Sequence, residues 1–236
     1  MTIINHTYKF IFIHVPKAAG TSLTTLLQQY TNYCDLEIGG TNFGEEIQPA
    51  YLKRFGISKH SSASAIYSIV GNNVWSEYFT FAFVRNPYLR CLSTFNFLRK
   101  WDGFNIKFSE KMKNFKNFEE YVLSDIWSES NGPDEIFRPQ KYWLVSNATN
   151  EIMMDYIGRV ELIDEHATFV IESIGNLKGN GGVNLNIPKL NVSANFSLSE
   201  FKNDSVVEKI AKKYKKDFEL FGYSFDPGLI NIQKFK

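Results

Sequence analysis

The sequence predicts a single α/β domain over residues 1–236, with a central parallel sheet of about four or five strands flanked by helices. Two strand–turn–helix units support this fold class. In the first, an apolar run from Phe10 to Val15 ends at Pro16, and leucines at helical spacing follow. In the second, the apolar run 79–84 leads into a helix start at Asn86-Pro87.

The first unit, KFIFIHVPKAAGTSLTTLLQQYT at residues 9–31, contains a short turn from Lys17 to Ser22. Such a junction directs backbone N–H groups and the positive end of a helix dipole toward one spot, which suits a phosphate. The lysine adds a positive charge, and two hydroxyls add donors. The alternative is that glycine and serine serve only the geometry of the turn.

Between the first turn and the second strand–turn–helix junction, the sequence predicts one excursion and one helix, followed by one strand. Residues 32–58 are rich in glycine and polar residues, and we expect a variable excursion with a short helix over 45–55. A helix over 62–70 begins at a capping serine and ends at Gly71. The run 79–84, FTFAFV, is apolar on both faces and predicts a central parallel strand.

The second turn follows this strand. Asn86-Pro87 combines a good N-cap with a good first helical residue, so a helix is predicted from about 88 to 100. Parallel α/β sheets bind ligands beyond the carboxyl ends of their strands. Lys17 to Ser22 and Arg85 both lie at such ends, as does the start of the helix that carries Ser93. Two anion sites at one sheet edge suggest a ligand with two separate phosphates.

The rest of the chain continues the alternation of helices and strands. The stretch 99–116 has six Lys or Arg against two acidic residues, and it is either a solvated face or a wall for an anionic acceptor. We interpret the lysines of 209–216 as the solvated face of a final helix that ends at Gly222. The remaining predicted elements are helices over 117–123, 140–144 and 163–174 and a strand over 155–160.

Composition narrows the class of protein. A formal net charge of +1 gives no global field that would imply nucleic acid or a membrane surface as a partner. The two cysteines, Cys34 and Cys91, do not resemble a disulfide framework. The apolar run 10–15 is too short for a signal peptide or a membrane span. We therefore expect a cytoplasmic protein in a reducing compartment.

The first turn differs from the phosphate loop of P-loop kinases. In the pattern G-x-x-x-x-G-K-[ST] the lysine follows the second glycine, whereas Lys17 precedes Gly20. A Walker B strand ends in an acidic residue that helps to hold Mg²⁺, whereas the strand 79–84 ends at Arg85. Transfer of a less charged group without a metal fits better, and a kinase of P-loop descent is the alternative.

The two turns together resemble a family. HVPKAAGTS and FAFVRNPYLRCLS look like the two nucleotide-binding signatures of the sulfotransferases, with the carbohydrate-type branch of heparan sulfate and chondroitin sulfotransferases and bacterial homologues as the nearest match. The blocks RPQKYWL, DYIGRVELIDE, IPKLNVS and KKDFELFGY resemble later parts of that branch. The resemblance implies a P-loop-like fold, 3′-phosphoadenosine 5′-phosphosulfate (PAPS) as donor, no metal, and a hydroxyl acceptor on a carbohydrate.

The resemblance also implies roles for individual residues. Lys17 would neutralise charge on the bridging oxygen as the S–O bond breaks, and Thr21 and Ser22 would bind the 5′-phosphate. Arg85 and Ser93 match the site of the 3′-phosphate. The remaining residues of the 5′-phosphosulfate loop are Ala18, Ala19 and Gly20, with the two alanines standing where many members have Thr-Gly or Gly-Gly.

The acceptor hydroxyl needs a proton acceptor positioned for in-line attack. His60 is the best candidate, since it precedes a predicted helix and falls between the two signatures, where the family's catalytic base tends to lie. The alternative is a surface or capping histidine. His14 ends the first strand, and we expect it to orient the loop. A module that binds the donor without chemistry is a further alternative for the protein as a whole.

Overall fold

The computed structural model describes residues 1–103, 106–129, 132–177 and 198–230. The chain divides into two compact units: the described residues of 1–84 and 140–192 form the first, and those of 85–139 and 193–236 the second. The single domain expected over 1–236 stays a prediction. The IPKLNVS block at 187–193 lies outside the described residues.

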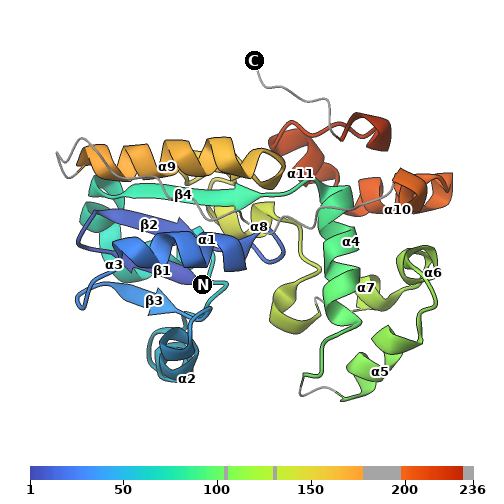
Figure 1. Ribbon diagram of the computed structural model, residues 1–236, viewed down its shortest axis with the longest axis horizontal. Helices are drawn as coiled ribbons and strands as arrows, with labels where there is room; N and C mark the ends of the chain where they lie inside the picture. The colour runs from blue at the N-terminus through green and yellow to red at the C-terminus, as the bar shows by residue number, and fades with distance from the viewer. Residues whose placement is uncertain (104–105, 130–131, 178–197, 231–236) are drawn as a thin grey trace. The chain divides into compact units, whose positions relative to one another are not determined.

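The first unit is built on a sheet with the strand order β3-β1-β2-β4-β5 (Figure 1). Its strands are β1 (Thr2–Asn5), β2 (Phe10–Ile13), β3 (Leu36–Ile38), β4 (Phe79–Val84) and β5 (Tyr156–Arg159). Strands β2, β4 and β5 are parallel, whereas β1 is antiparallel to both β2 and β3. Ile13 pairs with Ala82, so β2 and β4 end at the same edge of the sheet. The predicted α/β class and a central sheet of five strands flanked by helices are confirmed. The sheet was predicted as parallel, and the pairings of β1 make it mixed.

Helices flank this sheet. They are α1 (Gly20–Leu27), α2 (Asn42–Phe55), α3 (Ala63–Glu77), α8 (Lys141–Leu144) and α9 (Ile163–Leu177), with short 3-10 turns η1 (Gln28–Tyr30) and η3 (Val160–Leu162). Helix α9 packs against β5, α3 packs against β4 and α8, and α2 adjoins the edge strand β3. Strands β2 and β4 form the centre of the core, because β2 is buried throughout and β4 from its second residue on.

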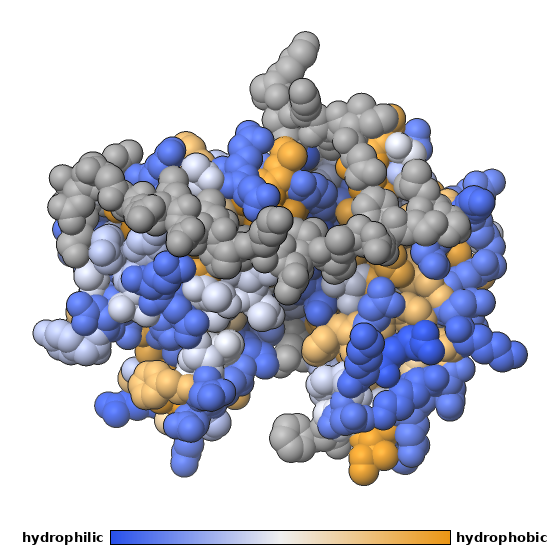
Figure 2. Space-filling model, in the orientation of Figure 1, coloured by the Kyte–Doolittle hydropathy of each residue, from blue (hydrophilic) through white to orange (hydrophobic). Residues whose placement is uncertain are grey.

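Helix α2 buries only Gly44 of its fourteen residues. Phe43, Leu52 and Phe55 are 63%, 53% and 43% exposed. Figure 2 shows apolar surface among hydrophilic side chains at the place that α2 occupies in Figure 1. The helix is therefore held by few contacts, and the polar ones among them matter for the site below.

Three sequence expectations for the first unit were wrong in detail. Strand β1 and the short strand β3 were not anticipated, and β2 ends at Ile13 rather than Val15. A four-residue and a three-residue strand give too short a pattern to predict, and they form by pairing: β1 with β2 and β3, and β3 with β1. Gly71, with φ of 77°, interrupts α3 as expected, but helical backbone resumes beyond it to Glu77.

The second unit consists of helices. They are α4 (Pro87–Leu98), α5 (Ile106–Asn114), α6 (Phe118–Leu123), α7 (Ile126–Glu129), α10 (Asp204–Lys213) and α11 (Lys215–Leu220), with the 3-10 turns η2 (Pro133–Glu135), η4 (Leu198–Phe201) and η5 (Pro227–Leu229). Aromatic rings form much of its core: Tyr121 stacks on Trp127 and on Phe95, at ring-centroid distances of 5.6 and 5.1 Å. None of the helices in the described ranges is long and apolar enough to cross a membrane.

The final helix and its lysines differ from the expectation. The helix breaks at Tyr214 into α10 and α11, and Gly222, with φ of 63°, follows the second piece as expected. Lys209 donates to the carbonyls of Leu123 and Ser124, at 3.0 and 2.7 Å. Lys213 donates to the carbonyl of Trp127 at 2.6 Å. These two lysines satisfy carbonyls at the ends of α6 and in α7, so the interpretation as a solvated face was wrong for them.

Candidate functional site

The turn after β2 carries Lys17, the lysine that the sequence analysis singled out. The amide of Ala18 donates to the carbonyl of Val15 at 3.2 Å, which closes a β-turn over Pro16 and Lys17. Proline at the first central position and a positive φ at the second are the features of a type II turn. Lys17 has φ of 65°, a conformation that usually requires glycine. The backbone at this lysine is therefore in a conformation that costs free energy for a residue with a Cβ.

Helix α1 begins directly after this turn. Ala19 is its N-cap and also has a positive φ, 59°, and no side chain caps the helix. The first amide that bonds back to the N-cap carbonyl is that of Leu23, at 3.1 Å. The amides of Gly20, Thr21 and Ser22 therefore have no acceptor within the helix, as expected for a first turn. Together with the helix dipole they offer a set of donors suited to an anion.

Gly20 is required by the imidazole of His14. A Cβ built on Gly20 would lie 1.7 Å from Nε2 of His14, far inside van der Waals contact. The ring of His14 thus packs directly on the first residue of α1. The expectation that His14 orients the loop stays a prediction, and this contact is its physical basis.

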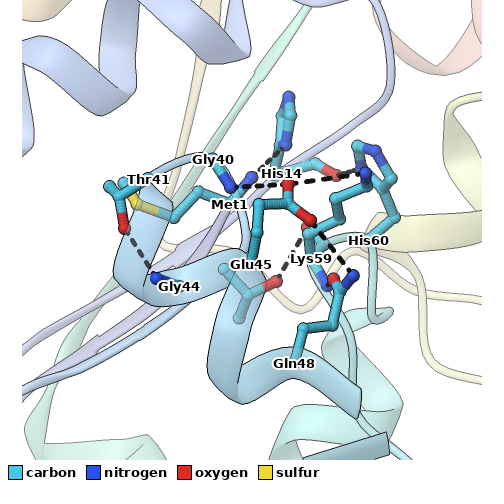
Figure 3. A network of polar contacts seen from close by, with 10 residues as sticks. Met1, His14, Gly40, Thr41, Gly44, Glu45, Gln48, Lys59 and His60 are labelled. Atoms are coloured by element: carbon cyan, nitrogen blue, oxygen red, sulfur yellow. Dashed lines mark hydrogen bonds and ion pairs between the residues drawn. The ribbon is translucent and has the colours of Figure 1, made fainter.

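His60 lies on the other side of His14. The two imidazole centroids are 4.5 Å apart, and Nδ1 of His60 is 3.1 Å from the carbonyl oxygen of His14 (Figure 3). A carbonyl oxygen can only accept, so Nδ1 of His60 carries the proton and donates it. His60 is therefore the Nδ1–H tautomer, and its Nε2 atom carries a lone pair. Among the described residues no hydrogen bond to this Nε2 atom is found.

The segment that carries His60 is fixed by polar contacts from several elements. The amide of Lys59 donates to Oε1 of Gln48 at 2.8 Å, and its carbonyl accepts from Oγ1 of Thr2 at 3.2 Å. The carbonyl of His60 accepts from the indole Nε1–H of Trp143 at 2.9 Å. Figure 3 shows Gln48 and Glu45 of α2 directed at Lys59, whose ammonium lies 3.6 Å from Oε1 of Glu45. The exposed helix α2 therefore holds the segment through side-chain oxygens.

Burial keeps both histidines neutral. Desolvation is the largest cause that lowers the pKa of His60 to about 3, and nearby positive charge adds to it. Desolvation likewise holds the pKa of His14 well below its usual value, and the N-terminal ammonium, which contacts Nδ1 of His14, is the next largest cause. Near neutral pH the imidazole of His60 is therefore uncharged, and burial makes it a weaker base than a free imidazole.

The second unit begins at Arg85, within the second sequence signature. Asn86 caps α4 with its side chain, which accepts from the amide of Tyr88 at 2.9 Å, and Pro87 is the first helical residue, as predicted. Arg85 is buried, with 7% of its surface exposed, and Ser93 is half-buried on α4. Arg90 is buried as well, and its guanidinium donates to the carbonyls of Ile136 and Arg138. Arg90 thus has a structural role in this unit.

Sequence reasoning missed the residues that hold His60. Gln48 and Trp143 are 11 and 83 positions from their partners. Gln48 is a polar residue in an excursion, and Trp143 lies in the RPQKYWL block, but neither position gives a signal of contact with the segment of His60. In the described part of the chain, no group of three or more His, Cys, Asp or Glu side chains is arranged to hold a metal ion.

The fold and the β2–α1 junction are those of an α/β protein with a strand–turn–helix suited to a phosphate. A family model described as "Sulfotransferase family" matches residues 1–224, and the chain belongs to this family. Membership supports sulfuryl transfer as the reaction, with a sulfate-donor nucleotide and an acceptor as its substrates. Neither the curated proteins nor the solved structures gave a match.

Proposed function

We propose that this protein transfers the sulfuryl group of PAPS to a hydroxyl of a carbohydrate acceptor, in line and without a metal. One observation carries the proposal: within the first unit, a ring contact through His14 connects the uncapped start of α1 to His60, whose lone pair is on Nε2. Donors for a phosphate and the proposed proton acceptor thus lie in one unit, two side-chain contacts apart, which supports group transfer to a hydroxyl at this place.

The residues of the β2–α1 junction fit the 5′ end of the donor. Three first-turn amides lack an acceptor within the helix, and no side chain caps them. Among the described residues, no hydrogen bond to the hydroxyl of Thr21 or of Ser22 is found. Ala18 and Ala19 remove no donor, because their amides are unaffected by the side chain. We assign this turn to the 5′-phosphosulfate.

The bound donor supplies an activated sulfuryl group, and the protein supplies position and charge. Lys17 stabilises the negative charge that develops on the bridging oxygen as the S–O bond breaks. Nε2 of His60 accepts the proton of the acceptor hydroxyl while its oxygen attacks. Nδ1 of His60 keeps its proton, since it is bonded to the carbonyl of His14. Arg85 and Ser93, in the second signature, bind the 3′-phosphate.

The proposal of a carbohydrate acceptor is supported by the resemblance of the signatures and the later blocks to the carbohydrate-type branch. The bacterial type rests on the same resemblance. A cytoplasmic location is supported by the two cysteines, which are both free thiols. The single domain over 1–236 is supported by a family match that includes both units.

Calorimetry with adenosine 3′,5′-bisphosphate, followed by a donor-dependent screen of carbohydrate acceptors, tests the proposal. We expect binding of the bisphosphate and transfer that persists in EDTA. Turnover of ATP that depends strictly on Mg²⁺ would instead support the kinase alternative. A non-catalytic binding module would instead bind the bisphosphate tightly and transfer no sulfuryl group to any acceptor. In that case His60→Ala should bind the bisphosphate as tightly as wild type.

A further inference from the structure

The main chain at His60 is held by a residue far away in the sequence. The indole Nε1–H of Trp143, on α8, donates to the carbonyl of His60 at 2.9 Å. Trp143 is fully buried, and 83 residues separate the two partners. A buried N–H group that loses its acceptor is costly, so this bond persists in the folded protein.

We propose that Trp143 is a positioning residue for His60: its indole N–H fixes the His60 carbonyl, and this keeps the imidazole as the Nδ1–H tautomer with Nε2 as proton acceptor. The inference rests on the proposed function, in which Nε2 receives the proton of the acceptor hydroxyl. It adds a residue that the sequence signatures do not include.

The geometry explains why one bond to the main chain controls the ring. The peptide of His60 is fixed at its carbonyl by Trp143, and the ring is fixed at Nδ1 by the carbonyl of His14, at 3.1 Å. With both points fixed, the ring cannot turn to exchange Nδ1 and Nε2. With the main chain released, the Nδ1–H bond to His14 loosens, and an unconstrained histidine prefers the Nε2–H form.

The chain offers a matched control for this bond. Trp127 is also buried, at 2% exposure, and its Nε1–H also donates to a carbonyl, that of Val122 at 3.2 Å. It lies in the second unit. Trp143→Phe and Trp127→Phe therefore remove the same kind of bond and leave a similar small void. Only the first removes a contact to His60.

Nitrogen NMR of ¹⁵N-histidine-labelled protein reads the tautomer directly, without any substrate. We expect wild type and Trp127→Phe to show His60 as the Nδ1–H form. We expect Trp143→Phe to show a mixture with the Nε2–H form and a kcat at least about tenfold lower at unchanged KM for the donor. The tautomer is a readout that a loss of packing alone does not move, because it is set by the partner of Nδ1.

Two results would overturn the positioning role. One is an Nε2–H form of His60 in the wild type, which needs no variant and so stands even if Trp143→Phe fails to fold. The other is a Trp143→Phe spectrum identical to that of Trp127→Phe. If the tautomer shifts in Trp143→Phe but kcat does not fall, the positioning role stands and the proposed role of His60 as proton acceptor fails.

Discussion

The imidazole of His14 occupies the space that a side chain on Gly20 would need, because a Cβ at residue 20 would lie 1.7 Å from its Nε2 atom. The same ring lies 4.5 Å from that of His60, measured between centroids. One histidine thus spaces the start of α1 from the proposed proton acceptor. A glycine at position 20 follows from this contact rather than from the turn, since its φ is not positive.

We expect Gly20→Ala to destabilise the protein by at least about 2 kcal/mol, as overpacking does in cores. A loss of stability would identify the steric contact with His14, because alanine in place of glycine in a helix otherwise stabilises a protein by about 1 kcal/mol. Urea unfolding of Gly20→Ala, His14→Ala and the double variant tests the contact. The double variant should recover about 1–3 kcal/mol relative to the sum of the single changes. Additive losses would show that the ring does not block this position.

Replacement of Ala19 by glycine should stabilise the protein, whereas replacement of Ala18 by glycine should destabilise it. Ala19 has φ of 59°, and this left-handed conformation costs a residue with a Cβ about 1–2 kcal/mol. Glycine removes that cost but adds freedom to the unfolded chain, so we expect Ala19→Gly to stabilise by up to about 1 kcal/mol. Ala18 is buried and has no positive φ, and Ala18→Gly should destabilise by about 1 kcal/mol or more. If the two variants change the thermal unfolding temperature equally, the backbone at Ala19 is not strained.

His60 should make the protein less stable in mild acid. Its folded pKa is about 3, below the unfolded value of about 6.5. Between these values the unfolded chain binds a proton that the folded chain does not. Stability is therefore complete above pH 6.5 and decreases as the pH falls toward 3, by about 1 kcal/mol per pH unit after allowance for partial exposure.

His60→Asn is the variant that tests this slope, because asparagine keeps a donor for the carbonyl of His14. The free energy of unfolding should fall less steeply from pH 6.5 to pH 5 in the variant than in wild type. Parallel curves would mean that His60 titrates normally. In kinetics, the same low pKa predicts no acid limb from His60 in kcat/KM between pH 5 and 8.

Lys17→Ala should lower turnover far more than affinity for the bisphosphate product. The lysine is assigned to charge that develops only as the S–O bond breaks, and loss of such a group costs about 100- to 1000-fold in kcat. Alanine is the appropriate change because it keeps a Cβ at φ of 65°, so backbone strain is unchanged. Lys53→Ala, an exposed lysine on α2, controls for net charge. Equal losses in kcat and affinity would contradict the bridging-oxygen role.

Arg85→Ala should weaken the binding of adenosine 3′,5′-bisphosphate by about 2 kcal/mol or more, roughly 30-fold in Kd. A ligand with only a 5′-phosphate should bind as it does to wild type. Arg99→Ala, on the exposed end of the same segment, controls for long-range charge. Calorimetry with both ligands measures the difference. If both ligands weaken alike, Arg85 has a structural role and the 3′-phosphate lies elsewhere.

The sequence by itself determined the two strand–turn–helix junctions, the α/β class and the strand β4. These depend on neighbours in the chain: Pro16 sets the first turn, Asn86 caps α4 through the amide two residues on, and β4 is apolar on both faces. Local chemistry of this kind is legible in a window of a few residues.

Only the tertiary structure decided the strands β1 and β3, the need for glycine at position 20 and the tautomer of His60. The carbonyl that fixes this tautomer is 46 residues from His60, and Trp143 is 83 residues away. Lys209 and Lys213 also reach carbonyls in α6, α7 and the turn between them, although their spacing is that of a solvated face. In each case the partner is brought close by the fold, and no pattern within one segment contains it.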